Sequence, residues 1–326
     1  MSLIEKMMER LAEEGTDALK SASRALPNPI DRTLTNADQR ALKQRPTADA
    51  KAVSESAGLD RSQWLSPARR TTTRKVEVNF ATLDKLGIVT PKSPNRRIEE
   101  ELRIIKRRLL INVIGFGGKV VDLANVIMVT SSVPAEGKTF LSINLAFSIA
   151  KEFDRTALLV DVDTASRGVT RILGLDSSIG FTNLISRSDL DLADVICTTN
   201  IERLKVIPSG NRLRDMTEHL ASHRTGLIVK DLAGRYRDRI VVIDCPPLLA
   251  TTETCVLARM VGQIVVVVEA ARTRQSDLLT ALSLLDETKV IGLVLNKTAE
   301  RYETNYYENY RGLYDTNQKQ LPCERD

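Results

Sequence analysis

The chain of 326 residues is 42% hydrophobic and 27% charged, with a net charge of +5, 16 Gly and 11 Pro. These values exclude collagen-like and low-complexity chains, and no apolar run approaches the roughly 18 residues needed to cross a bilayer. Four cysteines without CxxC spacing and two histidines make a disulfide framework or a structural zinc site unexpected. Because basic residues are mixed with 42 acidic ones and not interleaved with aromatics, we expect no nucleic-acid binding and a cytoplasmic location.

The N-terminal part shows little sustained pattern. Residues 3–12 place apolar side chains at helical spacing, which predicts a short amphipathic helix that docks on a protein partner or on its own domain, with binding to a membrane surface as the alternative. Residues 16–74 contain prolines and no sustained period, which predicts a flexible arm. A short alternating pattern opens residues 76–86, and GIVTPKSPN reads as a linker, so residues 1–94 are expected to precede the main domain.

A regular α/β pattern follows. IEEELRIIKRRLLIN predicts a helix and GFGG a turn, and a further helix is expected over residues 138–151. Short β-branched runs predict strands at residues 126–129, 157–160, 204–207, 239–244, 264–270 and 290–296. Such runs separated by helices indicate a mostly parallel sheet covered on both faces, with ligands at the carboxyl ends of the strands. We therefore expect an α/β domain over residues 95–300 and a tail over residues 301–326. The loop after the first strand, described next, makes the P-loop NTPase type the expected one for this domain.

A phosphate-binding loop is predicted after the first of these strands. Gly137, Lys138 and Thr139 open a helix directly after a strand and loop, as such a site requires. Backbone N–H groups and the helix N-terminus would face the phosphates, Lys138 would add positive charge, and the Thr139 hydroxyl would bind Mg²⁺. The strict pattern has Gly six residues before the lysine, where Ser132 stands here.

Three aspartates at strand ends strengthen this prediction. LLVDVD ends in Asp161 and Asp163, whose alternation points both carboxylates to the side of the loop. RIVVID ends in Asp244, the position of a second Mg²⁺-coordinating group. A helix cap or a turn is the alternative for any one of them.

The segments SSVPAEGKT, LLVDVD and VVIDCPPLL resemble the cytoplasmic kinase domain of bacterial tyrosine kinases over roughly residues 95–314. The opening SLIEKMMERL, LGIVTP and VIGLVLNK are similar to exosortase-associated tyrosine autokinases of exopolysaccharide gene clusters. The resemblance implies ATP and Mg²⁺ as cofactors, Thr139, Asp163 and Asp244 around the metal, and Asp161 as acceptor of the tyrosine proton. Asn296 is a candidate for the adenine pocket, with a turn as its alternative. The expected nucleotide-binding residues are Ser132, Val133, Pro134, Ala135, Glu136, Gly137, Lys138, Thr139 and Asn296.

The tail carries five of the six tyrosines in a sequence with no apolar pattern that would bury them. Coverage of a domain edge or interface is the alternative to phosphorylation. The expected phosphoacceptors are Tyr302, Tyr306, Tyr307, Tyr310 and Tyr314.

The resemblance also implies partners. Related kinases form rings in which one subunit's tail enters the next subunit's site, and a helix motif ExxRxxR mediates the contact between subunits. Glu100, Arg103 and Lys106 match this motif, with Lys in place of the last Arg. A charged surface helix is the alternative. A membrane-embedded polysaccharide co-polymerase as activator, a cognate tyrosine phosphatase and a place at the inner face of the inner membrane are implied as well.

Two residues depart from the family pattern. Ala135 occupies a loop position that is usually Gly, and Ala165 stands where an arginine is common, with Arg167 nearby. These departures leave open a catalytically weak ATP-binding regulatory subunit. A ParA/MinD-like switch ATPase is a second alternative, but such proteins have a second loop lysine followed by two glycines and no tyrosine-rich tail.

Overall fold

The computed structural model describes residues 74–90, 95–115, 121–176 and 178–298. Its centre is an eight-stranded sheet of order β1-β4-β5-β3-β6-β2-β7-β8. Every neighbouring pair is parallel except β4 and β5. The strands are β1 (Arg74–Val76), β2 (Val126–Ser131), β3 (Thr156–Asp161), β4 (Cys197–Thr199), β5 (Leu204–Ile207), β6 (Arg239–Asp244), β7 (Gln263–Glu269) and β8 (Val290–Asn296).

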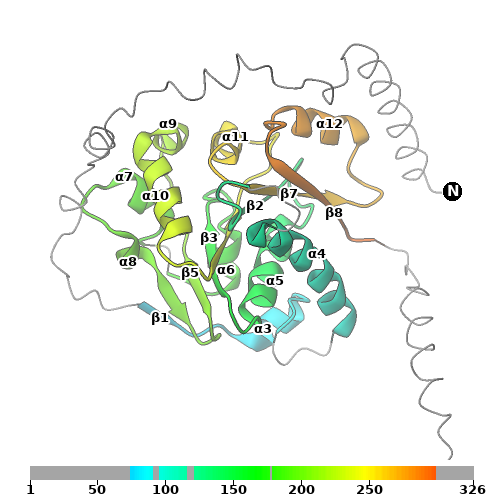
Figure 1. Cartoon of the computed structure of the whole chain (residues 1–326), viewed down its shortest axis with the longest axis horizontal. Helices are drawn as coiled ribbons and strands as arrows, with labels where there is room; N and C mark the ends of the chain where they lie inside the picture. The colour runs from blue at the N-terminus through cyan, green and yellow to red at the C-terminus, as the bar shows by residue number, and fades with distance from the viewer. Residues whose placement is uncertain (1–73, 91–94, 116–120, 177, 299–326) are drawn as a thin grey trace, which may run out of the picture. The chain divides into compact units, whose positions relative to one another are not determined.

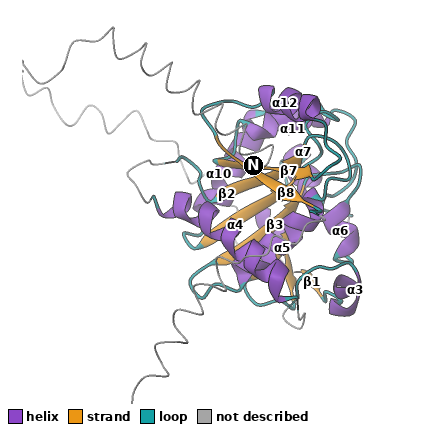
Figure 2. Cartoon of the chain, turned by 90° about the vertical axis from the view of Figure 1, so that its right-hand side faces the viewer, coloured by secondary structure: helices purple, strands orange, loops and turns teal. Residues whose placement is uncertain are grey.

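Helices cover both faces of this sheet (Figures 1 and 2). One layer contains α3 (Phe80–Lys85), α4 (Arg96–Ile114), α5 (Lys138–Ala150) and α6 (Gly168–Ile172). The opposite layer contains α7 (Phe181–Ser186), α8 (Leu192–Val195), α9 (Met216–Ala221), α10 (His223–Gly234), α11 (Thr252–Ala258) and α12 (Gln275–Ser283).

Two hydrophobic cores result from the alternation of side chains along the central strands. In β2, Val126 and Met128 pack in the core under α7–α12, whereas Ile127 and Val129 pack in the core under α4 and α5. All four are fully buried, which explains why a continuous apolar run forms this strand. The predicted α/β fold with a mostly parallel sheet is thus confirmed.

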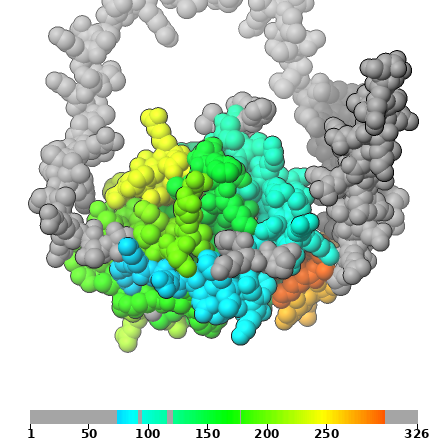
Figure 3. All heavy atoms as spheres, turned by 90° about the horizontal axis from the view of Figure 1, so that it is seen from below, coloured from blue at the N-terminus to red at the C-terminus, as the bar shows by residue number. Residues whose placement is uncertain are grey.

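The expected strands and the two expected helices are present, but the fold begins earlier than the sequence pattern indicates. The strand β1 pairs with β4, and neither of these three-residue strands was predicted. The segment interpreted as a linker is buried at Ile88, Val89 and Thr90. The Val89 amide donates to Asn144 Oδ1 at 2.8 Å, so α5 holds this segment against the core. Residues 74–90 are seen in blue and cyan on the side of the molecule that faces the viewer in Figure 3.

Several predicted segments lie outside the described residues: the helix over 3–12, the arm up to residue 73, most of the GFGG turn and the tail from residue 299. Gly115, the first residue of that turn, ends α4 in the left-handed conformation with φ of 76°. In the described part of the chain, no helix has the length and apolar character required to span a membrane.

Candidate active site

The loop between β2 and α5 has the sharp backbone turns of a phosphate-binding loop. Gly137 immediately precedes α5 with φ of 101°, a conformation that favours glycine. A Cβ atom at Gly137 would lie 2.0 Å from Asn296 Nδ2, so a larger residue here would displace the Asn296 side chain from its contact with the loop. Ala135 has φ of 69°, which shows that this position does adopt the conformation for which glycine is the favoured residue.

Lys138 is the first residue of α5 and forms a buried ion pair. Its Nζ lies 2.5 Å from Asp163 Oδ2, and the two side chains are 10% and 4% exposed. Burial lowers the pKa of Lys138, but the carboxylates of Asp244 and Asp163 outweigh this effect and raise it. Burial likewise raises the pKa of Asp163, but Lys138 outweighs it and holds the pKa below its usual value. The pair is therefore charged at neutral pH.

Asp244, at the end of β6, accepts two hydroxyl hydrogen bonds from α5. Thr139 Oγ1 donates to Oδ2 at 2.8 Å and Ser142 Oγ donates to Oδ1 at 2.9 Å. The carboxyl group is fully buried, and burial raises its pKa to about 7. The predicted pairing of the loop hydroxyl with a strand-end carboxylate is thus present, and Ser142, one helical turn after Lys138, is an additional partner.

Asp161 ends β3 beside Asp244, its register partner on β6. Its Oδ2 accepts hydrogen bonds from the Thr170 amide at 2.8 Å and the Thr170 hydroxyl at 2.7 Å, while Oδ1 is buried without a partner. Burial raises the pKa of Asp161 to about 6, against the opposing effect of Thr170. The strand ends at Asp161, so Asp163 reaches the site from the following turn and not through strand alternation.

Asn296, the last residue of β8, lies against the same loop. Its Nδ2 donates to the Glu136 carbonyl oxygen at 2.8 Å. The candidate adenine-binding residue is therefore next to the loop, and the contact that it makes here is with the protein backbone.

Two buried polar atoms at this edge of the sheet fit a site for a phosphorylated ligand. Ser132 Oγ in the loop and Asp161 Oδ1 have no hydrogen-bond partner, and buried polar groups are normally satisfied. Within the described residues no cluster of three or more His, Cys, Asp or Glu side chains is arranged to hold a metal ion. Mg²⁺ needs no such cluster, since it commonly binds through one or two protein groups together with phosphates and waters. Thr139 and Asp244 fit that pattern.

The second departure from the family pattern is located beside this site. Ala165 is exposed and brings no positive charge to it. Arg167 precedes α6 in the left-handed conformation with φ of 49°. A Cβ atom at Gly168 would lie 2.8 Å from the Thr139 side chain, so close packing of α6 on the loop requires this glycine.

The three residues expected to contact a second copy do not share one environment. Glu100 and Arg103 form an exposed ion pair on α4 at 2.6 Å. Lys106 is only 8% exposed: its Nζ donates to the Ser148 carbonyl at 3.1 Å and pairs with Glu152. Lys106 therefore fixes α4 to α5 and is not part of the exposed surface.

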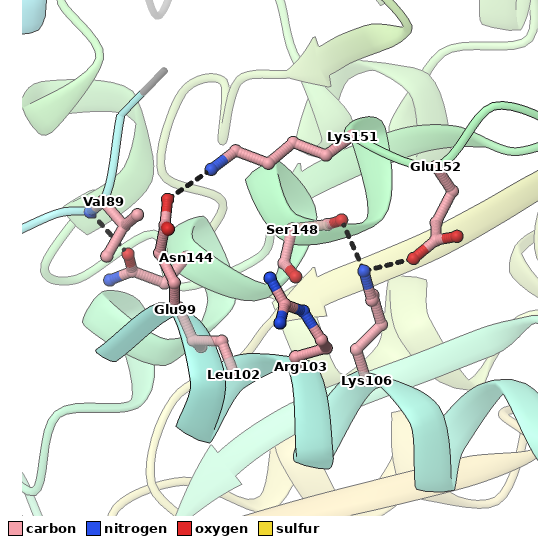
Figure 4. Close-up of a pocket in the computed structure, with 9 residues that line it drawn as sticks. All are labelled: Val89, Glu99, Leu102, Arg103, Lys106, Asn144, Ser148, Lys151 and Glu152. Carbon is pink, nitrogen blue, oxygen red and sulfur yellow. Dashed lines mark hydrogen bonds and ion pairs between the residues drawn. The ribbon is translucent and has the colours of Figure 1, made fainter. Parts of the chain in front are cut away.

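A hollow of about 220 Å³ lies between α4 and α5. Figure 4 shows Lys106 at one end, bonded to Ser148 and Glu152, and Lys151 paired with Glu99 at the other. The cations that line this hollow at its ends are thus neutralised by carboxylates of the same chain.

The fold and the loop define a P-loop domain, and comparison with known proteins identifies the class. The AAA domain family matches residues 124–293, which is more than half of the chain. The putative tyrosine-protein kinase CapB of Staphylococcus aureus is 32% identical over 186 residues, covering 56% of this chain and 80% of that protein. Tyrosine-protein kinase CpsD of Streptococcus agalactiae is 30% identical over 189 residues, covering 57% and 81%.

A solved structure agrees with these sequence relatives. The crystal structure of the chimerical protein CapA2B2 superposes with a TM-score of 0.56 and 26% identity, covering 70% of this chain and 95% of that one. The chain belongs to the bacterial tyrosine-protein kinase family. The family and the enzyme class expected from the sequence are confirmed.

The predicted phosphoacceptor tyrosines lie outside the described residues. Sequence reasoning missed Ser142 and Thr170, the hydroxyl partners of Asp244 and Asp161. Ser142 lies four residues after Lys138 on the same helix face, a spacing that signals the contact. No local pattern signals Thr170, which comes from the start of α6.

Proposed function

We propose that this protein is an ATP- and Mg²⁺-dependent tyrosine autokinase that phosphorylates its own C-terminal tyrosines. The observation that carries the proposal is the convergence of Lys138 and Thr139 with three aspartates, Asp161 and Asp244 at strand ends and Asp163 in the turn after β3, beside a loop with left-handed backbone. Family membership supports tyrosine as the acceptor. The end of β8 also supports the proposal, because β8 is parallel to β7 and its last residue, Asn296, contacts the loop.

In this proposal ATP with Mg²⁺ supplies the transferable phosphoryl group and neutralises its charge. The loop amides, Lys138 and the N-terminus of α5 hold the β- and γ-phosphates. Thr139 and Asp244 face the metal, with Asp163 close through its pair with Lys138. With Mg²⁺ bound at Asp244, the pKa of this carboxyl group would fall, because a nearby cation favours the ionised form, so Asp244 would be deprotonated in the loaded enzyme.

Asp161 is the proposed acceptor of the tyrosine proton. A pKa of about 6 leaves it ionised at neutral pH and yet closer to the phenol, whose pKa is near 10, than an exposed aspartate. The tyrosine Oη bonds to the γ-phosphorus as the bond to the ADP leaving group breaks, and the proton moves to Asp161 Oδ1. That oxygen has no other partner among the described residues.

The autokinase is tested by incubating the purified chain with labelled ATP and Mg²⁺ and mapping the label. Wild type is expected to label Tyr302–Tyr314, and Lys138→Met is expected to label none. Lys289→Met is the matched control, since this lysine binds the Val261 carbonyl at 2.9 Å at the opposite end of β8. ATP hydrolysis without tyrosine label would refute the kinase assignment and favour a switch ATPase.

We further propose that transfer occurs between copies in a ring, with Glu100 and Arg103 on the contact surface. Mixing Lys138→Met, which keeps its tail, with a chain truncated after Thr298, which keeps its site, tests this directly. Label on the tail of Lys138→Met is expected, and it should decrease when Arg103 of the truncated chain is changed to Glu. An unlabelled mixture would show that transfer is not between copies.

The remaining proposals concern the setting of the enzyme. They are control of exopolysaccharide synthesis or export, stimulation by a membrane-embedded co-polymerase, reversal by a tyrosine phosphatase, and a place at the inner face of the inner membrane. Phosphates on the tail would add about −1.5 to −2 charges per tyrosine and separate ring subunits by repulsion. A particle mass that does not change on phosphorylation would contradict this step.

A further inference from the structure

The end of β8 contacts the phosphate-binding loop through two consecutive residues. Asn296 Nδ2 donates to the Glu136 carbonyl at 2.8 Å, and Lys297 Nζ donates to the Ala135 carbonyl at 2.8 Å. Lys297 is held in turn by Glu269 Oε2 at 3.1 Å, at the end of the adjacent β7. Two backbone carbonyls of the loop are therefore bound by side chains from a strand 160 residues away in sequence.

The Glu136 side chain supports the loop from within. Its carboxylate, in a residue only 1% exposed, accepts the Val133 amide at 2.8 Å and the Thr273 hydroxyl. Thr273 Oγ1 also accepts the Glu269 amide at 3.0 Å. The loop is thus connected to the ends of β7 and β8 at three points: the carbonyls of Ala135 and Glu136, and the Glu136 carboxylate.

These contacts reach the loop at a residue whose backbone conformation is unfavourable. Ala135 has φ of 69°, and a residue with a Cβ atom is disfavoured in that region. Without an external contact, an alanine here would shift the loop toward other conformations. Lys297 binds the carbonyl of this same residue, so its contact favours the conformation that the alanine opposes.

We propose that Lys297 and Glu136 are positioning residues that hold the strained loop in its phosphate-binding shape and offset the presence of Ala135. This inference rests on nucleotide binding at the loop, the first step of the proposed function. It predicts that the contribution of Lys297 depends on the residue at position 135. In this role the Lys297 ammonium group and the Glu136 carboxylate contact other groups of the protein, whereas the backbone amide of Glu136 remains among the loop amides expected to face the phosphates.

A double-mutant cycle between Lys297 and Ala135 tests the proposal. The four proteins are wild type, Lys297→Met, Ala135→Gly and the double variant, with Lys289→Met as control because it removes an equivalent lysine–carbonyl contact elsewhere on β8. The first readout is hydrogen exchange of the loop amides of residues 132–138 without nucleotide. The second is the Kd for a fluorescent ATP analogue with Mg²⁺.

Lys297→Met is expected to speed loop exchange and to raise the Kd about fivefold in the Ala135 protein, because affinity falls with the populated fraction of the competent loop. In the Ala135→Gly background the same change is expected to have less than about a twofold effect, because glycine adopts this conformation without strain. Lys297→Arg should restore both readouts, whereas Glu136→Gln, which weakens both loop contacts of the carboxylate, should speed loop exchange.

Equal effects of Lys297→Met in both backgrounds would overturn the proposal and indicate direct contact with the nucleotide. Unchanged loop exchange in Lys297→Met or in Glu136→Gln would overturn it as well. If wild type binds no nucleotide, the proposed function fails, and the exchange comparison still decides whether Lys297 holds the loop. The Lys297 side chain is 45% exposed, so the Lys297 variants are expected to fold.

Discussion

Asp244 is predicted to lower the stability of the nucleotide-free protein. The group is fully buried and its pKa is raised from 3.8 to about 7. That difference corresponds to a destabilisation on the order of 4 kcal/mol at and above pH 7, at 1.36 kcal/mol per pKa unit. Asp244→Asn removes this cost but must match its amide to the Thr139 and Ser142 hydroxyls, which costs about 1–2 kcal/mol. The expected net stabilisation is about 2–3 kcal/mol.

The pH dependence follows from the raised pKa of Asp244. Between about pH 4 and pH 7 the folded state binds the proton more tightly than the unfolded state, so stability falls as pH rises through this window. Asp244→Asn lacks this contribution, so its advantage should grow from pH 4 to pH 7 and then level off. Thermal unfolding without nucleotide or Mg²⁺ should show a midpoint higher by about 6 °C at pH 8.

Kinase activity of the same variant is expected to fall at least about 100-fold, because a group facing the metal is lost. The control is Asp286→Asn. This aspartate has its pKa lowered by hydrogen bonds from Thr288, so its replacement should give no stabilisation. An Asp244→Asn protein that is less stable than wild type at pH 8, or a difference independent of pH, would refute the reasoning.

Three further predictions concern other contacts of the described chain. Thr170→Val removes a hydroxyl donor to Asp161, which should raise the pKa of this carboxyl group and move the acidic limb of the pH–rate profile up by about one pH unit. An acidic limb at the wild-type pH would exclude Asp161 as the base. Lys106→Met removes a buried ammonium group that joins α4 to α5, and urea unfolding should show a loss of about 1–3 kcal/mol, whereas no loss would show that the contact is dispensable. Gly180→Ala puts a Cβ atom 2.2 Å from the Pro208 carbonyl oxygen and should cost about 3 kcal/mol. Gly226→Ala in α10 meets no atom within 4 Å and should gain up to about 1 kcal/mol; equal effects of the two would contradict the packing described.

The sequence predicts best those strands that are buried on both faces, because each of them is a continuous apolar run. The strand β6 has both faces buried, so its four central residues, IVVI, form a continuous apolar run, and the charged residues Arg239 and Asp244 at the two ends make its bounds visible. By contrast, β1 and β4 are three-residue strands with the sequences RKV and CTT, which have no such run. The strand β1 forms at the edge of the sheet by pairing with β4, a contact between residues far apart in the chain, and β4 pairs on its other side with β5.

The site divides in the same way. The ends of β3 and β6 are local features, so Asp161 and Asp244 could be predicted from the strands that precede them. The burial of Lys106 could not, because a lysine on a basic helix reads as exposed until Glu152 and the Ser148 carbonyl are found beside it. The sequence places Ala135 at a loop position that is usually Gly, but it does not give the left-handed conformation of this residue, and the contact with Lys297 depends on where β8 ends relative to the loop.

The central claim is that the site at Lys138 transfers phosphate to the tail of this protein. Its most direct test is intact-mass spectrometry of the full chain after incubation with ATP and Mg²⁺, followed by mapping of the C-terminal peptides. We predict added phosphates confined to Tyr302–Tyr314 in wild type and none in Lys138→Met. A wild-type mass that does not change while ATP is bound, or phosphate that persists in Lys138→Met, would contradict the claim.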